Sequence, residues 1–203
     1  MDELTSLPFG TLLDSIAAKT PTPGGGGVAA MTGAMAAALA HMVVSYSLGR
    51  KSLAQHQAAL GQSSSYLHRA REVFLELARE DAEAYGLVNE LQKLAETDQR
   101  RQQELPGANQ AAIQVPLTAI AAADDLLRHC ESLASISNPH LHSDLAISAV
   151  LAESAARSAA WMVRVNSASL HDHDKRVQLM EQAKRMVEDC QRRREAVERA
   201  CTA

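Results

Sequence analysis

The sequence predicts an all-α protein, a single-domain bundle of about six helices built around a long central helix rich in Ala and Gly. Hydrophobic residues make up 46% of the 203 residues and aromatic residues only 3%, so Ala, Leu, Val and Met, which favour helices, dominate the apolar content. Runs with the two-residue period of a strand are absent. Proline and glycine separate long helical patterns without a low-complexity linker, so residues 1–203 are expected to form one domain.

Two prolines separate the first two helices. The first is expected around residues 9–18 and ends before Thr20-Pro21-Thr22-Pro23, because a residue that precedes proline resists the α conformation. The second begins in the tetraglycine at 24–27 and runs to about Leu48 without a charged residue. Residues 28–48 would form about 31 Å of helix, enough to cross a bilayer. Regularly spaced small residues, internal polar residues and the lack of an aromatic belt favour a buried core helix and no membrane partner.

The third helix, expected from about residue 52 to 94, carries a carboxylate on its buried face. Apolar residues recur every seven positions, and Asp81 interrupts that stripe between Phe74 and Val88. A carboxylate on a buried face must be paired, hydrogen-bonded or shifted in pKa. Two interpretations remain open: an ion pair with a basic residue from another helix, or a general acid or base whose pKa is moved by burial.

The second half of the chain reads as three further helices. After a polar stretch at 96–107, the fourth is expected over 109–133 with a kink or break at Pro116. A loop at 137–143 precedes the fifth, which runs to about 170, and the sixth takes residues 174–200. The run Arg192-Arg193-Arg194 lies in a part of the sixth that is rich in glutamates, which stand before and after it, and is expected to form a solvated face.

The fifth helix carries candidate site residues. Ser143 and Asp144 stand at its start, where a hydroxyl and a carboxylate satisfy free N–H groups, so capping alone would account for Asp144. Arg157 and Arg164 lie seven residues apart on one face. A solvated pair with Glu153, four residues earlier, would account for Arg157, whereas Arg164 has no such local partner.

Several classes of protein and site are disfavoured. A net charge of −4 and a pI near 6.1 argue against a nucleic-acid partner. An odd number of cysteines without metal spacing, together with an acidic N-terminal segment unlike a signal peptide, predicts reduced thiols and a cytoplasmic location.

The histidine clusters at 140–142 and 171–173 lack a third ligand at recognisable spacing, so no metal is expected. The glycines at 24–27 could present N–H groups to an anion or simply admit another backbone.

Six blocks of the sequence keep a recognisable order from about residue 6 to 171. They read PTPGGGGVAAMTGAMAAALAHMV, SLGRKS, EDAEAYGLV, VPLTAIAAADDLL, SNPHLHSDLAISAVLAE and AARSAAWMVRVNSASL. In these blocks the chain resembles the formiminotetrahydrofolate cyclodeaminase and methenyltetrahydrofolate cyclohydrolase family. It departs from the family pattern at Met162, where the family has asparagine, and near residues 94–96, where the usual Leu-Pro-Lys is missing and the segment looks shorter.

The resemblance implies an all-α fold that forms a homodimer and binds a tetrahydrofolate derivative as substrate, with no other cofactor. The expected reaction is hydrolysis of 5,10-methenyltetrahydrofolate to 10-formyltetrahydrofolate. The first alternative is a formiminotetrahydrofolate cyclodeaminase that releases ammonia. The second is a divergent, non-catalytic helical binding or assembly protein, which Met162 favours and the retained Asp81, Asp144 and Arg164 oppose.

The resemblance also implies roles for particular residues. Proton transfer beside a cationic or amine centre suits carboxylates, which gives Asp81 and Asp144 a catalytic task. Cationic side chains would hold the anionic glutamate tail of the folate. The expected substrate-binding residues are Gly24, Gly25, Gly26, Gly27, Lys51, Ser143, Arg157, Arg164 and Asn166.

Overall fold

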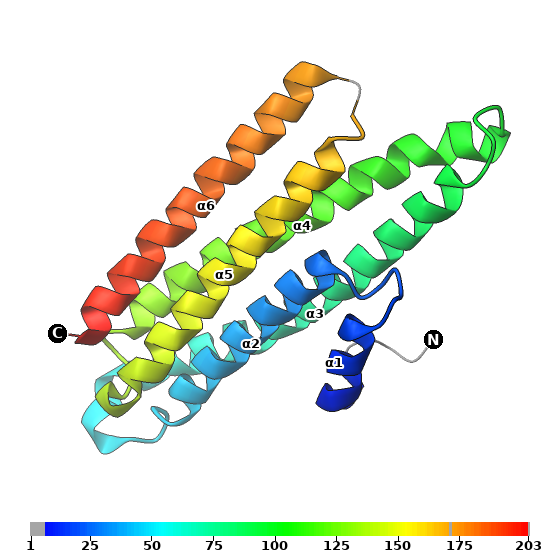
Figure 1. Cartoon of the computed structure of the whole chain (residues 1–203). Helices are drawn as coiled ribbons and strands as arrows, with labels where there is room; N and C mark the ends of the chain where they lie inside the picture. The colour runs from blue at the N-terminus through cyan, green and yellow to red at the C-terminus, as the bar shows by residue number, and fades with distance from the viewer. Residues whose placement is uncertain (1–6, 171, 203) are drawn as a thin grey trace.

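The computed structural model describes residues 7–170 and 172–202, and in that part of the chain every regular element is helical. The elements are α1 (Phe9–Ala17), α2 (Gly25–Ser45), η2 (Lys51–His56), α3 (Gln57–Gln92), α4 (Gln99–Leu133), η3 (Pro139–Leu141), α5 (His142–Ser167) and α6 (His173–Thr202). Figure 1 shows α2 to α6 as long, roughly aligned helices, with the short α1 beside them. The predicted all-α bundle is confirmed.

Helix α2 is the core helix of this bundle. It packs against α3 and α5 and more lightly against α4, and Ala36, Ala37 and Ala40 are fully buried. By length and composition alone it could cross a membrane, since its mean hydropathy is 1.7, but 61% of that window is buried inside the protein. The small residues let neighbouring helices approach its backbone, as their spacing predicts.

One of these approaches depends on a glycine. A Cβ built on Gly33 of α2 would lie 2.4 Å from the ring of Phe74 on α3, and that ring is fully buried. Real carbon atoms do not come this close, so the α2–α3 packing requires the missing side chain. The aromatic ring fills the space that a Cβ would occupy.

We expect Gly33→Ala to lower the free energy of unfolding. Overpacking a tight core costs about 1–3 kcal/mol, which outweighs the gain of about 1 kcal/mol from replacing a helical glycine by alanine. Urea denaturation measures the difference. The matched control is Gly61→Ala in α3, where a Cβ meets no atom within 4 Å, so that this variant should be more stable than the wild type. Equal stability of the two variants would contradict the packing argument.

Helix α4 starts earlier than the sequence predicts. The polar stretch 96–107 is helical from Gln99 onward, so its assignment as a connection is wrong for most of its length. The reason is a local cap: the side chain of Asp98 accepts hydrogen bonds from the backbone N–H of Arg100 (2.9 Å) and of Arg101 (3.1 Å). The hydrophilic composition of the stretch reflects an exposed first turn and not a loop.

The prolines of α4 do not interrupt it. Both Pro106 and Pro116 lie inside the helix, and residues 99–133 remain helical throughout, so of the kink or break expected at Pro116 the break is wrong. Packing against α3, α5 and α6 holds the helix together where a backbone hydrogen bond is lost. The carbonyl that Pro116 leaves free belongs to the site described below.

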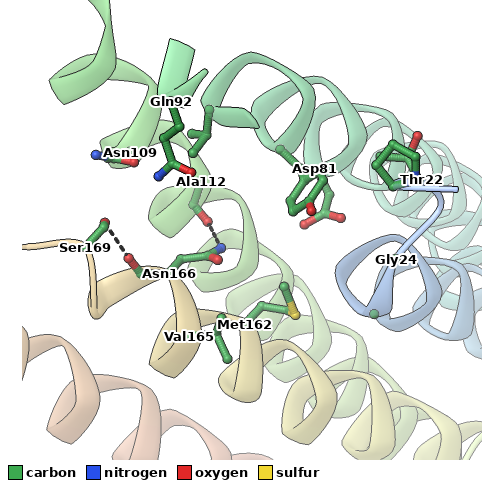
Figure 2. Close-up of a pocket in the computed structure, with 14 residues that line it drawn as sticks. Thr22, Gly24, Asp81, Gln92, Asn109, Ala112, Met162, Val165, Asn166 and Ser169 are labelled. Carbon is green, nitrogen blue, oxygen red and sulfur yellow. Dashed lines mark hydrogen bonds between the residues drawn. The ribbon is translucent and has the colours of Figure 1, made fainter. Parts of the chain in front are cut away.

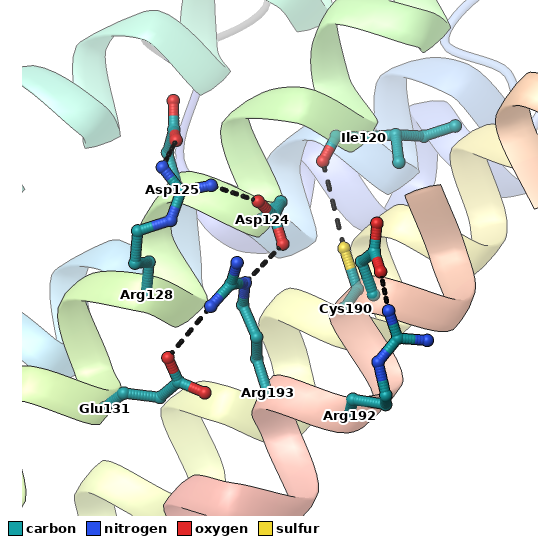
Figure 3. Close-up of polar contacts among 9 residues, drawn as sticks. Ile120, Asp124, Asp125, Arg128, Glu131, Cys190, Arg192 and Arg193 are labelled. Atoms are coloured by element: carbon teal, nitrogen blue, oxygen red, sulfur yellow. Dashed lines mark hydrogen bonds and ion pairs between the residues drawn. The ribbon is translucent and has the colours of Figure 1, made fainter. Parts of the chain in front are cut away.

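An ion-pair network fastens α6 to α4 (Figure 3). Arg193 donates to Asp124 (2.7 Å) and to Glu131 (3.0 Å), both on α4, and its side chain is only 29% exposed. The prediction of a solvated arginine face is therefore wrong for Arg193, and also for Arg194, whose side chain is 24% exposed. The prediction holds better for Arg192, which is 69% exposed and pairs within its own helix. The sequence could not separate these arginines, because helical periodicity does not tell which of them faces a neighbouring helix.

Candidate functional site

A cleft of about 390 Å³ opens between the start of α2 and neighbouring parts of α3, α4 and α5. Figure 2 shows its two regions. The Asp81 end contains that carboxylate together with Thr22, Gly24 and Gly25, and the amide end contains Gln92, Asn109, Asn166 and Ser169. The volume falls in the range of small-molecule sites.

At the Asp81 end, the carboxylate meets the glycines that begin α2. A Cβ on Gly26 would lie 2.0 Å from Asp81 Oδ1, so only glycine allows the carboxylate to come this close. The backbone N–H of Gly27 also donates a hydrogen bond to it. The N-terminus of α2 therefore binds an anionic group, as the glycines suggested, and this group is the carboxylate of Asp81.

The electrostatic setting of Asp81 bears on its two open interpretations. Burial raises the pKa of this carboxyl above its usual value, and the hydrogen bond from Gly27 offsets part of the rise. No basic side chain within residues 7–170 and 172–202 forms an ion pair with it, and it is the only charged residue among those described along the cleft. These observations favour the general acid or base over the structural ion pair.

The amide end is lined by uncharged hydrogen-bonding side chains from α3, α4 and the end of α5. Asn166 Nδ2 donates to the backbone oxygen of Ala112 at 2.6 Å, which ties α5 to α4. Ser169 Oγ donates to the backbone oxygen of Asn166 at 2.8 Å. Sequence reasoning named Asn166 through its motif but missed Gln92, Asn109 and Ser169. Isolated polar residues on three segments carry no shared periodicity, so only their meeting in space identifies them.

Met162 lies between the two ends, on the α5 side of the cleft. Its sulfur would be 3.6 Å from a Cβ built on Gly25, so the thioether reaches the start of α2. A methionine at this position presents an apolar, adaptable surface where an amide would present hydrogen-bonding groups.

The structure does not bring Lys51, Ser143 and Asp144 to this cleft within one chain. Asp144 is in the first turn of α5 and Asn166 in the last, which places them about 33 Å apart along the helix axis. Lys51 follows α2 at the end remote from its glycines. The two carboxylates proposed for catalysis, Asp81 and Asp144, therefore lie toward opposite ends of the bundle.

The two candidate arginines of α5 lie on its exposed side. Arg157 Nε is 3.6 Å from Glu153 Oε1, which is the predicted pair four residues apart. The guanidinium of Arg164 stacks over the ring of Trp161 at 5.3 Å from its centroid. Neither side chain lines the cleft.

The histidine clusters do not assemble a metal site in the described residues. No three His, Cys, Asp or Glu side chains gather closely enough to hold an ion within 7–170 and 172–202. His171, which belongs to the second cluster, lies outside that part of the chain.

Comparisons with known proteins agree on one family. The family model for formiminotransferase-cyclodeaminase matches residues 8–185. Methenyltetrahydrofolate cyclohydrolase of Methylorubrum extorquens is 33% identical over 166 residues, 80% of each chain. Formimidoyltransferase-cyclodeaminase of Gallus gallus is 26% identical over 92% of this chain, which spans 35% of that longer protein. The crystal structure of formiminotetrahydrofolate cyclodeaminase from Thermotoga maritima superposes with a TM-score of 0.89, at 28% identity over 98% of both chains. This chain belongs to the formiminotransferase-cyclodeaminase family.

Proposed function

We propose that this protein hydrolyses 5,10-methenyltetrahydrofolate to 10-formyltetrahydrofolate. The observation that carries the proposal is Asp81, the only charged side chain among the described residues that line the cleft. The methenyl substrate is a cation, and a half-buried carboxylate attracts a cation more strongly than an exposed one does. Similarity to the cyclohydrolase of Methylorubrum extorquens supports the same assignment.

The reaction needs a proton carrier beside the one-carbon unit. Water attacks the methenyl carbon, and the Asp81 carboxylate takes one proton from it. Asp81 then gives that proton to N5 as the bond between N5 and the carbon breaks, while the remaining hydroxyl proton passes to solvent and leaves a formyl group on N10. A carboxyl with a raised pKa is a stronger base when ionised, so its environment suits the first step.

The same cleft could serve the cyclodeaminase reaction, which the name of the Thermotoga maritima relative favours. In that reaction N10 attacks the formimino carbon and ammonia leaves, so a proton carrier is again required. A third reading is a helical binding protein without activity, in which Met162 has replaced a group needed for turnover.

One assay separates the three functions. The purified protein is offered each substrate in turn, and the near-ultraviolet absorbance of the methenyl chromophore is followed. Faster decay of the methenyl substrate demonstrates hydrolysis, and growth of the chromophore from the formimino substrate demonstrates deamination. No change with either substrate would overturn the proposal in favour of the binding protein.

The proposal includes a homodimer formed through the apolar face of α2 and α5. Exposed apolar side chains lie on both of these adjacent helices. Helix α2 contributes no charge to this side, whereas α5 carries Arg157 and Arg164 on its exposed side. We assign to this apolar face the side chains of Val28, Met35, Ile147, Val150, Trp161 and Val165, of which Val28 and Met35 also line a groove against α1. We propose a second copy of the chain as the partner on this face. Val165 belongs both to the face and to the lining of the cleft, so a partner bound there would border the site. A twofold axis perpendicular to the helices would then place the Asp144 end of one copy beside the Asp81 end of its partner.

We expect a dimeric mass by light scattering at micromolar concentration, and a monomeric mass for Trp161→Glu. Trp161 is 63% exposed in the single chain, and burying a new carboxylate in an apolar interface is costly. The matched control is Val73→Glu, at a valine of α3 that is 46% exposed and lies outside the apolar face. This control should remain dimeric. A monomeric wild type would refute the interface.

A cytoplasmic location is also part of the proposal. Cys130, Cys190 and Cys201 are all free thiols, and the first two are buried. Burial raises the pKa of the Cys130 and Cys190 thiols to about 12, so both remain protonated and unreactive. Unpaired cysteines are typical of proteins from a reducing compartment.

A further inference from the structure

The buried proline of α4 leaves a carbonyl without its helical donor. In a regular helix the N–H of residue 116 would bond to the carbonyl of Ala112, but Pro116 has no N–H. A partly buried carbonyl without a donor costs free energy, so another group must satisfy it. Asn166 of α5 supplies that donor at 2.6 Å (Figure 2).

This contact determines how the Asn166 amide is oriented. A backbone carbonyl can only accept, so the atom of Asn166 that faces Ala112 must be the nitrogen. Because the carboxamide is planar, fixing its nitrogen also fixes the position of Asn166 Oδ1. No group within the described residues donates to it, and Asn166 lines the cleft. Oδ1 is therefore a fixed acceptor available to a ligand.

The other groups of the amide end share its neutral, hydrogen-bonding character. Gln92 and Asn109 contribute carboxamides and Ser169 a hydroxyl, with no charge among them. Asp81 and Gln92 are about 16 Å apart along α3, so the amide end is separate from the proton carrier. Such a surface suits a flat heterocycle with alternating donors and acceptors. An anionic glutamate tail would find no cation there.

We propose that Pro116 is a positioning residue for the substrate and that the amide end binds the pterin ring. By withholding its N–H, Pro116 directs the Asn166 nitrogen to Ala112 and leaves Oδ1 to accept from an N–H of the ring. This inference rests on a folate substrate, as proposed above. It adds the orientation of the substrate in the cleft, with the pterin at the amide end and the one-carbon unit toward Asp81.

The test measures binding of pterin itself by isothermal titration calorimetry, because this fragment lacks both the one-carbon unit and the tail. Pro116→Ala restores the N–H, which competes for the Ala112 carbonyl and frees the Asn166 amide to rotate. We expect affinity to fall about five- to tenfold in Pro116→Ala and in Asn166→Ala, the scale of one hydrogen bond. The double variant should bind no more weakly than Asn166→Ala alone, because both changes remove the same contact.

The matched control is Pro106→Ala in the same helix. The carbonyl freed by Pro106 belongs to Gln102, which is exposed to water, so this variant should bind pterin like the wild type. A purely structural role of Pro116 would give losses that add to those of Asn166→Ala, and this outcome overturns the proposal. Wild-type affinity in Pro116→Ala, or no pterin binding by the wild-type protein, also overturns it.

The binding test can fail or succeed independently of the proposed reaction. Normal hydrolysis of the methenyl substrate with additive pterin-binding losses would leave the function intact and refute the positioning role. If the losses of pterin affinity in Pro116→Ala and Asn166→Ala are not additive, but the protein turns over neither substrate, the pterin site stands and the proposed reaction is refuted.

Discussion

Asp81→Asn is expected to fold normally and to lose most turnover, by about 10²- to 10⁴-fold in kcat, the scale of a general acid or base. Asparagine has nearly the same shape as aspartate, and its oxygen can still accept the hydrogen bond from Gly27. It cannot take a proton from water and carries no charge to attract the cationic substrate. Steady-state kinetics with the methenyl substrate measure the change.

Stability measurements on the same variant separate catalysis from folding. The raised pKa means that the folded state binds the Asp81 proton more tightly than the unfolded state does. The free energy of unfolding therefore falls as the pH rises from 3.8, the ordinary pKa of the unfolded state, through the raised pKa of the folded state. Above both pKa values, ionised Asp81 destabilises the fold. Asp81→Asn should unfold at the same or a higher urea concentration than wild type near neutral pH, with a smaller difference in acid.

The two measurements together decide between the interpretations of Asp81. Wild-type turnover in Asp81→Asn would show that this carboxylate carries no proton in the reaction. A clear loss of stability near neutral pH would instead show that its charge supports the fold, as a structural ion pair does.

Mixing Asp81→Asn with Asp144→Asn is expected to restore activity that neither variant has alone. Each site of the proposed dimer takes Asp81 from one copy and Asp144 from the partner. A heterodimer of the two variants then contains one site with both carboxylates and one site with neither. Random exchange makes half of the dimers mixed, so activity should recover to about a quarter of the wild-type value.

The experiment requires subunit exchange, achieved by co-expression or by unfolding and refolding the mixture. Each variant refolded alone is the control and should remain inactive. An Asp144→Asn protein with full activity would leave Asp144 only an electrostatic role in the first turn of α5, where a negative charge favours the helix dipole and where the N-cap, Leu141, forms no side-chain cap hydrogen bond. Two inactive variants whose mixture stays inactive would refute the shared site.

Prediction from the sequence succeeded where the signal was local and periodic. The spacing of small residues identified α2 as a core helix, and the interruption of a seven-residue stripe singled out Asp81. It failed where a second helix decided the outcome. Arg193 reads as solvated beside its glutamates, yet it bridges to Asp124 on α4. The start of α4 was missed because the polar composition of residues 99–107 outweighed the cap at Asp98.

The sequence by itself determined the helices, the apolar core and the carboxylate that interrupts it, since helix periodicity relates residues three to seven positions apart. The tertiary structure decided which groups share the cleft. Gly26 meets Asp81, and Asn166 meets Ala112, across separations far longer than any helical repeat. Such contacts depend on how the helices cross, and the periodic pattern of the sequence carries no information about them. For the same reason only the packed bundle separates Asp144 from Asp81, although both are candidate catalytic carboxylates in the sequence.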